Sequence, residues 1–288
     1  MKTWSDRYWT SRDGLKLHYR DYDGRSDRPP VLCLHGLTRN SRDFDGLAQR
    51  IAGDWRVIAP DFRGRGRSQH DPVSANYVPP TYAADTLQLL SELAIGQAVF
   101  VGTSLGGLVT MAIASFAPQL VAGAVLNDVG PELGRAGLDR IRSYVGKQVV
   151  FRSWEDAASA FETQFGHQHP AYGRNDWIRY ARRVCVEADG GIELDYDMAI
   201  AEPFTVVGAA PAPDVWPLFR ALAGRPVLIL RGETSDLLLS DVAERMREVI
   251  PGAELVTVHR VGHAPDLNET ESAAAIERLL HSVLVSSA

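Results

Sequence analysis

Short apolar runs alternate with longer amphipathic stretches along most of the chain. Residues 31–34 and 57–59 are continuous apolar runs, the pattern expected of strands that are covered on both faces. Between them, residues 41–51 place apolar side chains three and four residues apart, after a serine that can cap a helix. Strands and helices that alternate in this way form βαβ units, so the chain predicts an α/β fold with a mostly parallel sheet flanked by helices.

The same reasoning places the other elements and an interruption in the alternation. After Pro131 the sequence shows helical periodicity, many aromatic residues and no strong interior strand, until it leaves through the proline-rich residues 209–213. We therefore expect a core made of residues 1–130 and 212–288, with a helical cap inserted at 131–211. The remaining predicted strands are 15–20, 98–101, 121–126, 227–230 and 254–258, and the remaining predicted helices are 81–93, 107–114, 241–249 and 271–285.

One serine stands at a sharp corner between a strand and a helix. Gly102-Thr103-Ser104-Leu105-Gly106 directly follows the apolar run 98–101 and directly precedes the helical run 107–114. A tight turn of this kind strains the central residue, and strand and helix can close together only if the residues two before and two after it lack a Cβ. The corner therefore predicts a nucleophile at Ser104, exposed toward a substrate.

A serine hydroxyl needs a base, and the base needs a carboxylate that orients it. His263 follows the last apolar strand, and Asp236 follows the strand before it. In a parallel sheet these two loops and the Ser104 corner open on the same edge. We therefore expect Ser104, Asp236 and His263 to meet there as a catalytic triad.

With these residues in place, the chain resembles the Ser-type α/β-hydrolase fold family, in its capped group of esterases, lactonases and carbon–carbon hydrolases. The chain order serine, acid, histidine is that of this family. The resemblance covers nearly the whole chain, is weakest in the cap, and implies a mostly parallel eight-stranded sheet. The matching segments are Leu34-His35-Gly36-Leu37, residues 61–68, the Ser104 corner, residues 232–236 and Gly262-His263.

The resemblance also implies a role for each matching residue. Ser104 becomes the nucleophile, His263 the general base and then acid, and Asp236 the orienting carboxylate. The backbone N–H groups of Leu37 and Leu105 become the oxyanion hole, which stabilises the charge that develops on the substrate oxygen. Aspartate in place of Ser104 would have indicated an epoxide hydrolase or a dehalogenase.

Several residues have alternative interpretations. Asp128, just past the predicted strand 121–126, is a second candidate for the triad acid, although a pocket-lining or turn-capping role is favoured for it. For His35 a structural role in the loop beside Gly36 is favoured over proton transfer. The pocket candidates are His35, Gly36, Asp128 and the cap aromatics Trp154, Phe161 and Trp177.

The tripeptide His167-Gln168-His169 has a spacing that some metal ligands use. Because no cysteine or paired carboxylate pattern completes a metal site there, we expect a solvated cap loop. The three arginines of residues 61–68 lack the lysine and hydroxyl ending of a nucleotide-binding loop. We expect instead that these arginines form salt bridges that hold the loop in place.

The composition of the chain indicates which classes of molecule it binds. The chain has 288 residues, a formal net charge of −6 and two cysteines, which favours a small-molecule substrate over nucleic acid or an anionic membrane. No apolar stretch typical of a signal peptide or a membrane span is seen, and the low cysteine content suits a reducing compartment. We expect a cytoplasmic enzyme without a metal or organic cofactor; its oligomeric state is left open, with a homodimer as one alternative.

These observations predict a serine hydrolase that opens a carboxylic ester or lactone bond of a small, moderately apolar metabolite through an acyl-enzyme. The first alternative is a carbon–carbon bond hydrolase acting on ring-fission dienoates, for which basic side chains such as Arg179, Arg182 or Arg183 would have to point into the pocket. The second alternative is a ligand-binding relative without catalysis.

Overall fold

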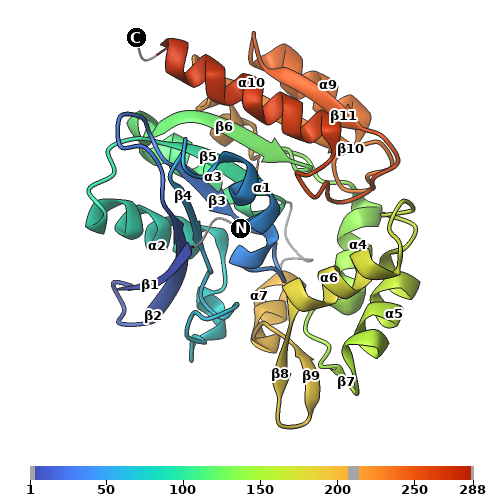
Figure 1. Cartoon of the computed structure of the whole chain (residues 1–288). Coiled ribbons are helices and arrows are strands. Elements are labelled where there is room, and N and C mark those ends of the chain that lie inside the picture. The colour runs from blue at the N-terminus through green and yellow to red at the C-terminus, as the bar shows by residue number, and fades with distance from the viewer. Residues whose placement is uncertain (1–3, 207–213, 287–288) are drawn as a thin grey trace.

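An eight-stranded sheet forms the centre of the molecule, as the computed structural model shows for residues 4–206 and 214–286 (Figure 1). The strand order is β1-β2-β4-β3-β5-β6-β10-β11. All neighbours from β4 to β11 are parallel, whereas β2 runs antiparallel to both β1 and β4. The predicted α/β-hydrolase fold class is confirmed. The strands are β1 (Trp4–Thr10), β2 (Lys16–Tyr22), β3 (Val31–Leu34), β4 (Val57–Pro60), β5 (Ala98–Thr103), β6 (Val121–Asn127), β10 (Val227–Gly232) and β11 (Glu254–Val258).

Helices cover both faces of this sheet. Along β5, Ala98 and Phe100 pack into one apolar cluster with α2 and α3, while Val99 and Val101 pack into the opposite cluster with α1 and α10. This burial on both faces explains why the strands are continuous apolar runs. The helices are α1 (Asp45–Ile51), α2 (Pro79–Glu92), α3 (Leu105–Phe116), α8 (Trp216–Arg220), α9 (Ser240–Val249) and α10 (Thr270–Ser286), with short 3₁₀ helices η1 (Ser41–Phe44), η2 (Ser74–Asn76) and η3 (Pro118–Leu120).

The connection between β6 and β10 leaves the sheet and packs on itself. We call its described residues 131–206 the insertion; the expected end of the cap at residue 211 lies outside the described residues. In Figure 1 these elements lie together to one side of the sheet, and Phe161, Phe165 and Trp177 belong to an apolar cluster of their own. The insertion contains α4 (Arg135–Tyr144), α5 (Trp154–Phe165), α6 (Arg174–Val184), η4 (Met198–Ile200), α7 (Ala201–Val206) and the strands β7 (Val150–Phe151), β8 (Cys185–Ala188) and β9 (Gly191–Leu194).

The insertion differs from the expectation in one respect. The sequence indicated helices alone, but β7, β9 and β8 form an antiparallel three-stranded sheet. These strands are two to four residues long, and several of their side chains are exposed, so they lack the continuous apolar run that identifies a core strand.

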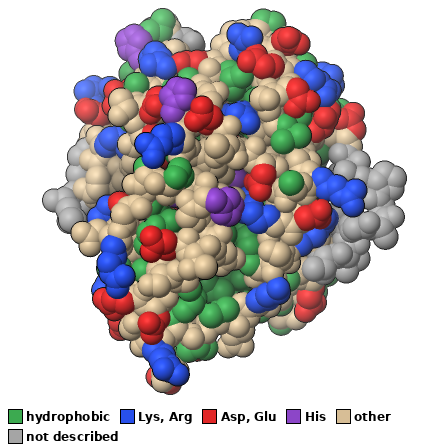
Figure 2. Space-filling model, turned by 90° about the vertical axis from the view of Figure 1, so that its right-hand side faces the viewer, with side chains coloured by type: hydrophobic (Ala, Val, Ile, Leu, Met, Phe, Trp, Pro, Cys, Tyr) green, Lys and Arg blue, Asp and Glu red, His purple; other side chains and the backbone are tan. Residues whose placement is uncertain are grey.

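Charged side chains of both signs are exposed on the surface. On the side shown in Figure 2, acidic and basic side chains are interspersed. No helix in the described part of the chain is both long enough and apolar enough to span a membrane.

Candidate active site

Ser104 occupies a strained position between β5 and α3. Its backbone has φ 52° and ψ −116°, a conformation that L-residues avoid unless the surrounding structure holds them there. A Cβ at Gly102 would lie 2.5 Å from the carbonyl oxygen of Gly106, and a Cβ at Gly106 would lie 1.9 Å from the carbonyl oxygen of Leu34. The two glycines are therefore required at these positions, as the sequence predicted.

A continuous hydrogen-bonded chain of side chains begins at Ser104. Its Oγ lies 3.0 Å from Nε2 of His263, and Nδ1 of His263 lies 2.8 Å from Oδ2 of Asp128. Because an ionised carboxylate only accepts hydrogen bonds, Nδ1 carries the proton and Nε2 is free to accept one from the serine. The arrangement couples an alcohol to an imidazole that is ready to act as a base.

The carboxylate in this chain belongs to Asp128 and not to Asp236, which corrects the expectation. Asp128 follows β6, which lies between β5 and β10 in the sheet. It is fully buried and also accepts hydrogen bonds from the Gly232 N–H at 2.8 Å and the Ser235 hydroxyl at 2.6 Å. These donors hold both carboxylate oxygens in place.

Asp236 is bound elsewhere. Both of its oxygens accept hydrogen bonds from Arg140 of α4, each at 2.7 Å. Partial burial opposes ionisation, but the hydrogen bonds and positive charge of Arg140 outweigh it and lower the pKa of Asp236. The order of the residues in the sequence could not decide between the two aspartates, because both follow strands that end at the same edge of the sheet. Arg140 of the insertion binds Asp236, and His263 is hydrogen-bonded to Asp128.

The two residues expected to supply the oxyanion hole, Leu37 and Leu105, directly follow Gly36 and Ser104 in the chain, and these two residues are neighbours in space. Leu105 is the first residue of α3, so its N–H has no acceptor one turn earlier in the helix. Gly36 lies beside the serine, since a Cβ on it would be 3.7 Å from the Ser104 Cβ. Leu37 and Ser104 both line the same pocket.

His35 fixes the peptide that carries the Leu37 N–H. The N–H of Phe62 donates to Nε2 of His35 at 3.0 Å, so Nδ1 bears the proton and donates to the carbonyl oxygen of Gly36 at 2.7 Å. In a trans peptide the carbonyl and the following N–H point in opposite directions, and the Leu37 N–H is thereby held pointing away from His35. Complete burial lowers the pKa of His35 to about 4, which keeps it neutral.

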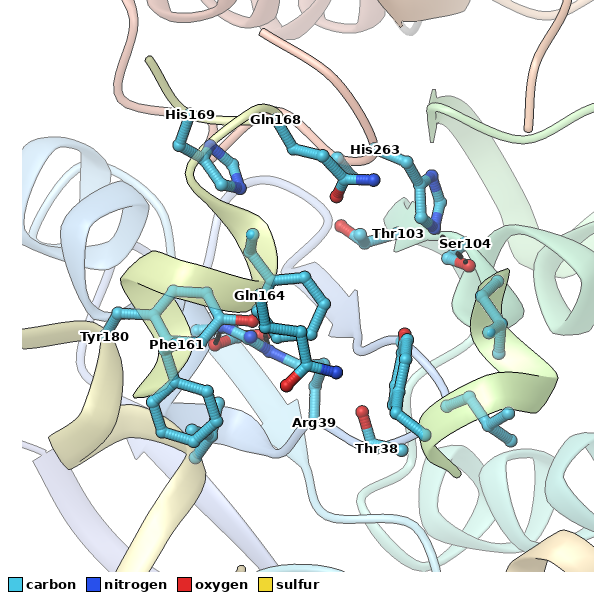
Figure 3. A pocket seen from close by; sticks show the side chains of 18 of the residues that line it. Thr38, Arg39, Thr103, Ser104, Phe161, Gln164, Gln168, His169, Tyr180 and His263 are labelled. Carbon is cyan, nitrogen blue, oxygen red and sulfur yellow. Dashed lines mark hydrogen bonds and ion pairs between the residues drawn. The ribbon is translucent and has the colours of Figure 1, made fainter. Parts of the chain in front are cut away.

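A pocket of about 330 Å³ adjoins Ser104 and His263 and is bounded by the insertion (Figure 3). Of the residues that the sequence suggested for the pocket, Gly36 and Phe161 line it. His35 and Asp128 are buried behind it and do not line it. Trp177 is buried in the apolar cluster of the insertion, and Trp154 lies away from the pocket, where its Nε1 donates to Glu187 at 3.0 Å.

Three polar residues of the insertion that line the pocket, Arg140, Gln168 and His169, were not predicted. The loop 167–169 was expected to be solvated, but Gln168 and His169 are buried and only His167 is exposed. In the amide orientation that satisfies both of its groups, Gln168 donates to the carbonyl oxygen of His263 at 2.7 Å and accepts from Nε of Arg140 at 2.8 Å. Arg140 and Gln168 thus join the insertion to the loop that carries His263.

The comparisons with known proteins give the following matches. The model of the alpha/beta hydrolase family matches residues 31–277. A 3-hydroxybutyrate-oligomer hydrolase of Cupriavidus necator is 35% identical over 260 residues, covering 87% of each chain. A 2-(acetamidomethylene)succinate hydrolase of Mesorhizobium japonicum is 30% identical over 237 residues, covering 82% of this chain and 81% of that one. The crystal structure of an alpha/beta hydrolase from Novosphingobium aromaticivorans superposes with a TM-score of 0.93 at 54% identity, covering 98% of this chain and 99% of that one.

Proposed function

We propose that this chain, which belongs to the alpha/beta hydrolase family, is a serine hydrolase that opens a carboxylic ester bond of a small, moderately apolar metabolite. Matches to named hydrolases over more than four fifths of the chain support a hydrolase. The observation that carries the proposal is the hydrogen-bonded chain from Ser104 through His263 to Asp128.

In the proposed reaction, Ser104 Oγ attacks the ester carbonyl carbon as its proton passes to Nε2 of His263. The carbonyl oxygen becomes an oxyanion, which the N–H groups of Leu37 and Leu105 stabilise; losing one such donor costs about 3 kcal/mol. His263 then gives its proton to the departing alkoxide, which leaves as the alcohol. A water molecule, deprotonated in turn by His263, opens the acyl-enzyme and releases the acid, and Ser104 regains its proton.

Two observations bear on the choice between an ester and the carbon–carbon alternative. None of the basic side chains suggested for the alternative lines the pocket, although Arg39, Arg140 and Lys147 do. Arg179 is exposed and paired with Asp176, Arg182 lies over the ring of Trp154, and Arg183 is paired with Asp266. The relative that is 35% identical is named for 3-hydroxybutyrate oligomers, which also supports ester cleavage; a lactone is a cyclic ester and stays within the proposal.

The test compares wild type with Ser104→Ala on matched panels of aryl esters, lactones and dienoates. Ester turnover should be lost in the variant while its thermal unfolding is unchanged, because the substitution removes one oxygen that lines the pocket and no core volume. A fluorophosphonate should add mass at Ser104 of the wild type only. Full ester turnover by Ser104→Ala would refute the proposal, and turnover of dienoates alone would establish the alternative.

A further inference from the structure

The pocket has a second polar region, which faces Ser104 from the opposite side. In Figure 3, Ser104 and His263 lie on one side of the cavity, while His169 and Tyr180 lie on the other and Arg39 lies between them. All of these side chains line the pocket. None of His169, Tyr180 and Arg39 has a part in the proposed bond cleavage.

His169 is a buried imidazole whose ring is directed into the cavity (Figure 3). Its exposed fraction is 7%, and its ring stacks on Tyr172 with centroids 4.5 Å apart. Nδ1 is buried and has no hydrogen-bond partner among the described residues. Burial lowers the pKa of His169 to about 4, so the ring is neutral and carries one proton.

The position of that proton follows from the burial of Nδ1. A buried N–H without a partner is rarer than a buried acceptor without one, so we place the proton on Nε2. Nε2 is then the nitrogen through which His169 can donate to a ligand.

Arg39 and Tyr180 add further donors on this side. The Arg39 guanidinium lies 4.5 Å over the ring of Tyr180 and uses Nε and Nη2 to hold Asp43, each at 2.7 Å. Its Nη1 protons are left over, since a guanidinium has five N–H donors. Within the described residues the Tyr180 hydroxyl has no hydrogen bond either, which leaves its proton available.

The charges around these donors nearly cancel. Asp43 and Asp266 face Arg39 and Arg183, which are paired with them. Lys147 lines the pocket, is exposed, and has no ion pair within the described part of the chain. The region is therefore rich in donors, and the pocket to which it belongs carries one further positive charge at Lys147, which matches an oxygen acceptor.

We propose that His169, Tyr180 and Arg39 form a specificity subsite that binds an acceptor oxygen of the substrate, a second carbonyl or a carboxylate, remote from the scissile carbonyl. The inference rests on the proposed function and extends it to a substrate class. That class is esters whose acyl chain carries another acid or ester group. Buried donors that such a substrate satisfies would be left unpaired by a simple alkyl ester, which penalises it.

Three chromogenic esters test the subsite: 4-nitrophenyl pentanoate, mono-4-nitrophenyl glutarate and methyl 4-nitrophenyl glutarate. They are assayed with wild type, His169→Phe, and the matched control His167→Phe, in which the exposed histidine of the same loop is changed. We expect wild type to prefer a glutarate ester, and His169→Phe to lower kcat/KM about tenfold for that ester but not for the pentanoate. Tyr180→Phe, which removes a single oxygen, should act in the same direction if His169→Phe folds poorly.

A comparison of the two glutarate esters shows whether the acceptor oxygen of the substrate belongs to a carboxylate or to a carbonyl. A preference for the half-ester shows a carboxylate ligand, and equal rates for both show a carbonyl. Equal kcat/KM for pentanoate and glutarate esters in wild type, or an unchanged preference in His169→Phe and Tyr180→Phe, would overturn the subsite while leaving ester hydrolysis intact.

A binding measurement keeps the subsite testable if no ester is cleaved and the proposed function fails. Monomethyl glutarate and dimethyl glutarate are titrated calorimetrically into Ser104→Ala and into the Ser104→Ala, His169→Phe double variant. The subsite predicts about tenfold weaker binding of at least one of them to the double variant. Equal affinities of both proteins for both compounds would refute it.

Discussion

Two aspartates lie near His263, and their partners decide which of them holds it. Asp128 receives only neutral donors besides His263, namely the Gly232 N–H and the Ser235 hydroxyl. Asp236 faces a guanidinium that takes both of its oxygens. A carboxylate already bound to a cation by two hydrogen bonds has little to gain from a neutral imidazole. The assignment therefore depends on Arg140, a residue more than ninety positions away from Asp236.

Replacing each aspartate by asparagine separates their roles. Asp128→Asn should lower kcat on a cleaved ester roughly a thousandfold or more, because an amide cannot hold His263 in the tautomer that accepts from Ser104. Asp236→Asn should keep kcat within a few fold. It should lower the free energy of unfolding by up to about 3 kcal/mol, because Arg140 loses its counter-charge while partly buried.

Steady-state kinetics and denaturant unfolding of both variants check this prediction, with circular dichroism confirming that each is folded. The reverse ranking, with Asp236→Asn the slower enzyme, would restore Asp236 as the carboxylate that serves His263.

Individual residues were predictable where local geometry alone fixes them. Ser104 could be identified because its glycine neighbours are imposed by the turn, and His263 because it follows the last strand. His169 and Gln168 could not be, since their burial depends on how the insertion packs over the sheet. In the sequence they form a polar tripeptide with His167, which is typical of a solvated loop.

At the level of elements, seven of the eight core strands were predicted close to their observed bounds, and only the edge strand β1 (Trp4–Thr10) was missed. The expected strand 254–258 has the bounds of β11, and the expected strand 31–34 has those of β3. Burial on both faces makes these runs uniformly apolar. The strands β7, β8 and β9 escaped detection because they pair with one another at the edge of the insertion and carry exposed residues such as Val150 and Val186.

The packing of α3 against the sheet depends on Gly106. In Gly106→Ala the new Cβ would meet the Leu34 carbonyl oxygen at 1.9 Å, so strand and helix must separate. We expect a loss of about 3 kcal/mol or more in the free energy of unfolding. Intrinsic helix propensity works in the other direction, since alanine is favoured over glycine within a helix by about 1 kcal/mol.

Gly96→Ala is the matched control, because a Cβ there meets nothing within 4 Å and Gly96 is exposed. Its free energy of unfolding should stay within about 0.5 kcal/mol of wild type. Denaturant titrations of both variants measure the difference. Equal stabilities would mean that the close approach of α3 to β3 is not required.

On the scale of the whole molecule, polar contacts join the insertion to the core beside the pocket. Arg42 of η1 pairs with Asp195 at 2.6 Å and donates to the Arg183 carbonyl oxygen at 3.0 Å. Arg140 and Asp236 form a second such contact. The sequence predicted a helical cap inserted between the strands 121–126 and 227–230. The partners across the junction could not be predicted, because each pair joins residues that are far apart in the chain.

Buried neutral histidines couple the stability of the whole molecule to pH. His35 and His169 each have a pKa lowered to about 4 by burial, whereas a histidine in the unfolded chain has a pKa of about 6.5. Between these values the unfolded state binds more protons than the folded state, so stability rises with pH. It is fully present above about pH 6.5 and is lost as the pH falls toward 4. Carboxylates with lowered pKa values, such as Asp236, add their loss only at still lower pH.

As the pH falls from 7 to 5, each of the two histidines should therefore lower the free energy of unfolding by roughly 2 kcal/mol. Urea unfolding of wild type at a series of pH values measures the slope, and His169→Phe should flatten it by about one proton per molecule. His167→Phe, which changes an exposed side chain, should leave the slope as in wild type. Because slopes are compared, any constant difference in stability between the variants cancels. A His169→Phe protein with the wild-type slope would show that His169 takes up a proton in the folded state as readily as in the unfolded chain.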